Sequence, residues 1–195
     1  MAKPIVARWE WRTFGARFDE PEARIRKFEQ GNFKESGEVY VLSRNSDENV
    51  KVRDDLLDIK SLQEVNADGL EQWFPVLKAG FPISVEDLKK VFGYFKAPEP
   101  IFGRKEYTFD QFLNEIVRPN QNLRLVQVKK KRYIYVINGA VTEIAETEFD
   151  GVALRTICVE HEDPEVVMKT VRELGMEDLP NINYIQAMKK TVGMA

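Results

Sequence analysis

Apolar and polar residues alternate in many short segments of this chain, and turn-forming residues separate the segments. A period of two is typical of β-strands, because successive side chains of a strand point to opposite faces. The alternation predicts strands at 4–14, 38–43, 49–53, 56–65, 70–77, 123–131 continuing into 133–137, 141–148 and 152–160. The breaks between consecutive strands are short, so we expect neighbours in the chain to pair antiparallel. Asn138 and Gly139, between two alternating segments, are typical of a tight hairpin turn.

Segments with a helical period lie between these groups of strands. Four of them begin with a side chain that can accept a hydrogen bond from the first turn: Asp19, Ser84, Thr108 and Asp163. Gly31 and Gly175 would end the first and the fourth of these helices, and a fifth helix is predicted at about 183–191. Strands and helices therefore occur in blocks without regular alternation, which predicts an α+β protein with a mainly antiparallel sheet.

Several predicted strands carry charged residues, rather than merely polar ones, opposite their apolar residues. The charged positions are Arg8, Glu10, Arg12, Lys51, Arg53, Asp58, Lys60, Lys130, Arg132 and Glu160. A sheet with one solvated face explains such a pattern in any single strand. The repetition leaves a second interpretation open, in which the sheet closes into a barrel, helices cover its apolar outside and the charges face inward. Arginine and lysine would then bind phosphate oxygens, and carboxylates would hold Mg²⁺ or Mn²⁺.

The composition is that of an ordinary globular protein. Of 195 residues, 43% are hydrophobic and 31% are charged, and we expect one domain spanning 1–195. The sequence contains neither a long apolar run nor a signal-peptide stretch at its start, so we expect a cytoplasmic protein without a membrane partner. The formal net charge of −3 argues against nucleic acid as a partner. The basic run 129–132 does not change this expectation, because a strand divides its side chains between two faces.

The chain has one cysteine, Cys158, and one histidine, His161. These counts exclude an internal disulfide and a zinc site built from the usual nitrogen and sulfur ligands. In a strand, residues three apart point to opposite faces, so the two are not expected to form a catalytic dyad. The glycine motifs of dinucleotide-binding folds and P-loops are also absent. Any chemistry would therefore depend on carboxylates, lysine, arginine, tyrosine or a metal held by oxygen ligands.

Short charged motifs follow one another along the predicted strands. They are RWEWR at 8–12, VKVR at 50–53, DIK at 58–60, KKRYIY at 130–135, the acidic strand 141–148 with Glu146, CVE at 158–160 and NYI at 183–185. In order and spacing they resemble the motifs of the CYTH domain family, the triphosphate tunnel metalloenzyme superfamily, over nearly the whole chain. The resemblance implies a closed antiparallel eight-stranded β-barrel that forms a tunnel, with helices packed on the outside. Members of that family hydrolyse tripolyphosphate, thiamine triphosphate or RNA 5′-triphosphate ends, or cyclise ATP, with Mg²⁺ or Mn²⁺.

The resemblance also implies roles for individual residues. The phosphate-binding residues would be Arg8, Arg12, Lys51, Arg53, Lys60, Lys130 and Arg132. The ligands of a Mg²⁺ or Mn²⁺ ion would be Glu10, Glu146 and Glu160, and Glu10 and Glu160 would be catalytic. The expected partner is a small triphosphate or polyphosphate, with a homodimer left open.

Two departures from the family pattern affect the metal side of this comparison. Arg8 and Cys158 occupy positions at which the family has glutamates, whereas the phosphate-binding positions remain basic. Two functional hypotheses follow. The first is a metal-dependent triphosphate hydrolase, in which catalysis depends mainly on positioning the substrate and stabilising charge in the transition state. The second is a module that binds polyphosphate or a nucleotide without turnover.

Overall fold

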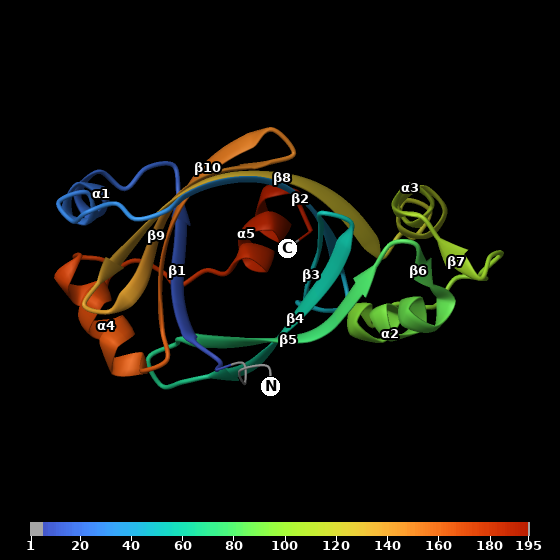
Figure 1. Ribbon diagram of the computed structural model, residues 1–195, viewed down its shortest axis with the longest axis horizontal. Helices are drawn as coiled ribbons and strands as arrows, with labels where there is room; N and C mark the ends of the chain where they lie inside the picture. The colour runs from blue at the N-terminus through green and yellow to red at the C-terminus, as the bar shows by residue number, and fades with distance from the viewer. Residues whose placement is uncertain (1–5, 195) are drawn as a thin grey trace. The chain divides into compact units, whose positions relative to one another are not determined.

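The computed structural model describes residues 6–194, so residues 4 and 5 of the first predicted strand lie outside the described part. The strands are β1 Trp9–Gly15, β2 Phe33–Ser43, β3 Asn49–Arg53, β4 Leu56–Val65, β5 Glu71–Gly80, β6 Ile83–Ser84, β7 Glu106–Tyr107, β8 Leu123–Ile137, β9 Ala140–Phe149 and β10 Val152–His161. Eight of them hydrogen-bond in the order β1-β10-β9-β8-β2-β3-β4-β5 and close into a barrel (Figure 1), while β6 and β7 form a separate small sheet. The predicted α+β class and the closed antiparallel eight-stranded barrel are confirmed. Helix α5 (Tyr184–Thr191) departs from the prediction of helices packed on the outside, because Tyr184 stacks on Tyr40, which lies on the face of β2 opposite the core residue Val41.

The helices are α1 Asp19–Ile25, α2 Val85–Phe95, α3 Phe109–Gln111, which continues into a π-helix at Phe112–Val117, α4 Pro164–Glu173 and α5 Tyr184–Thr191. The side chains of Ser84, Thr108 and Asp163 cap the starts of their helices as expected. Asp19 does not cap α1, because it lies in the first turn after Phe18. Helix α1 also ends well before Gly31, whose N–H donates to the carbonyl of Ile134 in β8. None of the described helices has the length and hydropathy needed to span a bilayer.

The described chain divides into two compact units, each with its own hydrophobic core. The first unit contains the chain up to Ser36, Leu62–Phe74 and Lys129–Asn183, and the second contains Gly37–Ser61, Pro75–Val128 and the chain from Tyr184. In the first unit, α4 packs on one face of β1, β9 and β10 (Figure 1). The residues that meet there include Trp11, Ile144, Ile157, Val159, Val167 and Val171, all buried.

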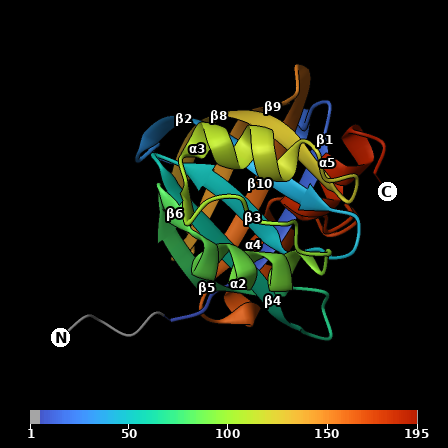
Figure 2. The ribbon, with the colours of Figure 1, turned by 90° about the vertical axis from the view of Figure 1, so that its right-hand side faces the viewer.

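In the second unit, α2 and the α3 segment pack on one face of β3 and β4 (Figure 2). Its buried residues include Val50, Val52, Leu57, Ile59, Leu88, Phe92 and Phe112. In both units the apolar residues alternate with charged ones along the strand, as the sequence predicts. The opposite side of the strands, which we call the charged face, therefore presents charged side chains away from the core.

Candidate functional site

Three glutamates meet on the charged face of the first unit, because three neighbouring strands present them at matching positions. Glu10 of β1 lies opposite Glu160 of β10 on one side and opposite Glu71 of β5 on the other. Burial raises the pKa of Glu160, and the nearby charge of Glu10 raises it further. Carboxylates held close together in this way are unfavourable unless positive charge compensates them, and such arrangements are common at functional sites.

Arg12 supplies part of that positive charge from the middle of the charged face. Its Nε donates to Glu10 at 2.8 Å, and its Nη1 lies 3.5 Å from Glu143 and 3.3 Å from the hydroxyl of Thr156. Only 6% of Arg12 is exposed, so these contacts operate away from bulk water. The main chain of Arg12 is also held, because its N–H donates to Asn181 and its carbonyl accepts from Ile182.

Arg132 of β8 completes this group from the other side of Glu143. Its Nε lies 2.6 Å from Glu143 Oε2 and its Nη2 lies 2.5 Å from the same oxygen. Burial raises the pKa of Glu143, but the charges of Arg12, Arg132 and Lys130 outweigh burial and lower that pKa overall. Lys130 is 6% exposed and acts on Glu143, so the predicted common face of Lys130 and Arg132 is observed.

Arg8 contacts the remaining carboxylate of the group. Its Nη1 lies 3.3 Å from Oε1 of Glu160, and about half of the Arg8 side chain remains exposed. Glu71 is held differently, since it accepts hydrogen bonds from Asn183 and from the indole N–H of Trp73 at 3.0 Å. The structure therefore brings together Arg8, Glu10, Arg12, Lys130, Arg132 and Glu160, all of which the sequence indicates as site residues.

Glu146 does not join this group, in contrast to the expectation from the sequence. In the β9–β10 pairing it lies opposite Arg155, on the face that carries the core residues Ile144 and Ile157. Its carboxylate contacts Arg155 at 3.2 Å, and Arg155 also binds Glu22 of α1. The pairing places Glu146 on the opposite side of the strand from Glu160, so it cannot ligate a cation together with Glu10 and Glu160.

Glu143 occupies the position on the charged face that the sequence comparison assigns to Glu146. It lies opposite Cys158, and Cys158 lies opposite Arg12. The position of the turn at Asp150 and Gly151 is the feature of the sequence that could have identified Glu143 as the residue on the charged face. Because that turn pairs Phe149 with Val152, counting back along both strands places Glu143, not Glu146, on the face of Cys158 and Glu160.

The donor set of the first unit does not fit the divalent cation that the family resemblance implies. Among residues 6–194, no group of three histidine, cysteine, aspartate or glutamate side chains is arranged to hold a metal ion. Oε1 of Glu10 contacts Arg12, and Oε1 of Glu160 contacts Arg8. A Mg²⁺ ion requires a near-octahedral set of oxygens, and fixed guanidinium charges at the same carboxylates oppose its binding.

The second unit has a charged face of its own on β2, β3 and β4. Lys51 lies opposite Asp58 of β4, and Asn49 lies opposite Lys60. Burial lowers the pKa of Lys51, and the charges of Lys60 and Arg53 lower it further. Glu38 and Asp58 act in the opposite direction without restoring the usual pKa. Three cations thus share a partly buried surface with two carboxylates, an arrangement that an added anion would stabilise.

Arg53 and the C-terminal helix border this second group. Arg53 Nη1 lies 3.3 Å from Glu38, whose side chain is almost completely buried, whereas nearly half of the Arg53 side chain is exposed. Tyr40 of β2 lies opposite Lys51, and its ring stacks on that of Tyr184 in α5 at 6.3 Å between centroids. Lys189 of the same helix binds Asp47 in the β2–β3 connection at 2.6 Å. Helix α5 therefore packs next to Lys51.

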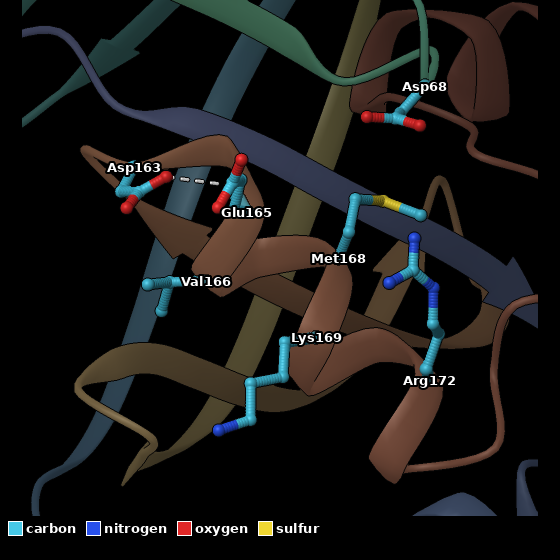
Figure 3. Close-up of a pocket in the computed structure, with 7 residues that line it drawn as sticks. All are labelled: Asp68, Asp163, Glu165, Val166, Met168, Lys169 and Arg172. Carbon is cyan, nitrogen blue, oxygen red and sulfur yellow. Dashed lines mark hydrogen bonds between the residues drawn. The ribbon is translucent and has the colours of Figure 1, made fainter.

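A surface pocket of the first unit lies between α4 and the loop around Asp68 (Figure 3). Its lining combines acidic residues with Lys169 and Arg172, and the N–H of Glu165 donates to Asp163 within the helix cap. Apart from Asp68, the lining residues belong to α4 and its N-cap, not to the charged face. The pocket therefore adds no residue to the group around Arg12.

Comparisons with known proteins detect the fold but no sequence family. No protein-family model matches the sequence, and no curated protein is significantly similar to it. Among solved structures, a conserved hypothetical protein from Pyrococcus furiosus is 17% identical with a TM-score of 0.52, covering 91% of this chain and 98% of its own. The PH1012 protein of Pyrococcus horikoshii is 18% identical with a TM-score of 0.52, covering 91% and 97%.

A third solved structure carries a described activity. It is HpAC1 from Hippeastrum, named as an adenylyl cyclase with a dominant triphosphatase activity, and it is 11% identical with a TM-score of 0.52. The match covers 94% of this chain and 96% of that protein. At these identities the likeness establishes a shared architecture along nearly the full length of each chain.

Proposed function

Because the chain has a divergent CYTH-type fold, we propose that it binds a linear triphosphate or polyphosphate through the basic residues of its charged faces. The observation that carries this proposal is the cluster of Lys51, Arg53 and Lys60. Burial and the charges of Lys60 and Arg53 disfavour the charged form of Lys51 and lower its pKa. A phosphate chain would supply the missing negative charge and form charge-assisted hydrogen bonds with the same side chains.

On the charged face of the first unit, the phosphate-binding residues would be Arg8, Arg12, Lys130 and Arg132. Arginine suits this task, because its planar group donates several hydrogen bonds in a fixed geometry. The guanidinium groups of Arg12 and Arg132 are held in place by Glu10 and Glu143, so little conformational freedom would be lost on binding. The likeness to HpAC1, with its described triphosphatase activity, supports a triphosphate as the ligand class.

Strand β8 offers a matched pair of variants for testing this proposal. Lys130 is buried on the charged face, whereas Lys131 is exposed and points to the other side of the strand. We expect Lys130→Met to weaken tripolyphosphate binding about tenfold or more, since a hydrogen bond to a charged group contributes roughly 1.5–3 kcal/mol. Lys131→Met should change the affinity less than about twofold. Titration calorimetry measures both, and equal effects of the two variants would contradict the proposal.

Hydrolysis of the bound triphosphate is a second candidate function. The carboxylates of Glu10, Glu71 and Glu160 favour it, because they lie on adjacent strands and burial raises the pKa of Glu160, as is common for catalytic acids and bases. The test is phosphate release from tripolyphosphate with Mg²⁺ or Mn²⁺, measured beside Glu160→Ala. Release that the wild type shows and Glu160→Ala lacks would establish hydrolysis with Glu160 as a catalytic residue. Binding without release would leave the chain as a polyphosphate-binding module.

A further inference from the structure

Arginines and glutamates form two adjacent series of ion pairs on the charged face of the first unit. The pairs are Arg8–Glu160 in one series and Glu10–Arg12, Arg12–Glu143 and Glu143–Arg132 in the other, and we call them together the arginine–glutamate ladder. Its two parts are adjacent, because Glu10 and Glu160 lie opposite each other in the β1–β10 pairing. The ladder has three carboxylates and three guanidinium groups, so its negative and positive charges are equal in number.

Arg8 has a special place in this ladder because it lies at an end and remains accessible. Its side chain is 48% exposed, compared with 7% for Arg12 and 29% for Arg132. A guanidinium group donates from several N–H groups and stays positively charged at any physiological pH. Arg8 can therefore contact Glu160 with one edge and donate hydrogen bonds to a phosphate group from the part that faces solvent.

A divalent cation and Arg8 would compete for the same place. A cation that bridges carboxylates to phosphate oxygens needs a carboxylate oxygen such as Oε1 of Glu160, which Arg8 already contacts at 3.3 Å. The fixed charge of Arg8 would also repel the ion at this short distance. Bridging between a carboxylate and a phosphate is something that a guanidinium group can itself provide.

We propose that this chain binds tripolyphosphate as the free anion, with the guanidinium group of Arg8 in the place of a divalent cation. Binding therefore requires neither Mg²⁺ nor Mn²⁺. The inference rests on the proposed triphosphate-binding function. It adds that the ligand is tripolyphosphate without a bound metal ion, and that Arg8 determines this preference. Free Mg²⁺ competes for the phosphate oxygens, so it leaves the apparent affinity unchanged or lowers it.

The test is calorimetric titration of tripolyphosphate into the full chain, once with EDTA and once with excess MgCl₂ at matched ionic strength. The wild type should bind at least as tightly with EDTA as with MgCl₂. Arg8→Gln should bind about tenfold more weakly with EDTA, because one charge-assisted contact is lost. Arg8→Glu should bind more weakly still with EDTA and regain affinity in MgCl₂, because an added carboxylate favours a bound cation.

Arg17→Glu is the matched control for Arg8→Glu, because it makes the same change of charge. Arg17 lies in an exposed ion pair with Asp19. The Arg17→Glu variant should bind like the wild type in both buffers, and melting curves report whether each variant is folded. Wild-type binding that needs MgCl₂, or wild-type affinity in Arg8→Gln, overturns the inference while the triphosphate-binding function stands. An absence of wild-type binding in both buffers overturns the proposed function and the inference together.

Discussion

Individual residues on the charged faces differ in whether the folded chain favours their charged form. Lys51 is the clearest case of a disfavoured charge, because burial and two neighbouring cations lower its pKa. For a basic group, a folded-state pKa below the unfolded value means that stability is reduced at neutral pH. The stability is regained as pH rises from the folded-state pKa towards the unfolded value of 10.5.

Replacing Lys51 should therefore stabilise the chain while weakening its function. We expect Lys51→Met, which keeps the length of the side chain, to raise the free energy of unfolding by roughly 0.5–2 kcal/mol. The same variant should lose about tenfold or more in tripolyphosphate affinity. Urea denaturation and calorimetry measure the two effects. A variant that is less stable than the wild type would show that Lys51 is a structural residue.

Glu143 differs from Lys51, because the folded chain favours its charged form. Its folded-state pKa is lowered, so its carboxylate adds stability above the unfolded value of 4.5, and that stability is lost as pH falls through the folded-state pKa. Glu143→Gln leaves Arg12 and Arg132 without their shared carboxylate and should cost about 3 kcal/mol at neutral pH. The difference from the wild type should shrink below about pH 4.

Glu148→Gln, on the same strand, is the control for this measurement. Its pair with Lys129 is exposed, so the variant should cost at most about 1 kcal/mol. Urea denaturation at several pH values measures the free energy of unfolding of both variants. Equal losses in Glu143→Gln and Glu148→Gln would contradict a special role for Glu143.

At the scale of single elements, the sequence predicts strands better than it predicts helix ends. The alternation of β3, β4 and β8 identifies both their cores and their charged faces, because each side chain's direction follows from its position in the strand. Segments 123–131 and 133–137 form one continuous strand, β8. Helix α1 is shorter than predicted, since the main chain at Gly31 bonds to β8 instead of continuing the helix. Such a tertiary hydrogen bond leaves no local signal in the sequence.

The start of α4 provides a prediction that concerns stability alone. Asp163 accepts a hydrogen bond from the N–H of Glu165 at 2.9 Å, and Pro164 begins the helix. Asp163→Ala should lower the free energy of unfolding by roughly 0.5–2 kcal/mol, because a capping acceptor is lost. Glu162→Ala, at the neighbouring exposed position, should have little effect. Thermal unfolding measures both, and neither variant should change tripolyphosphate affinity.

At the scale of the whole molecule, ligand binding should be visible as a gain in stability. A ligand at about 100 times its dissociation constant adds about 2.7 kcal/mol to the folded state. For a chain of this size that corresponds to roughly 5–10 °C in melting temperature. Tripolyphosphate with EDTA should produce this shift, whereas orthophosphate at equal ionic strength should produce a much smaller one. Equal shifts with both anions would indicate a general salt effect.

The sequence by itself determines which residues are apolar, which are charged and how they alternate. That is enough to predict an antiparallel α+β fold and to identify Arg12, Lys51 and Arg132 on charged strand faces, since these follow from local geometry. Only the tertiary structure decides that Glu143 rather than Glu146 faces Arg12, because strand pairing sets which residues meet. It also decides that Arg8 contacts Glu160, which lies far away in the sequence. The charge balance of the site depends on these pairings, which bring distant residues together.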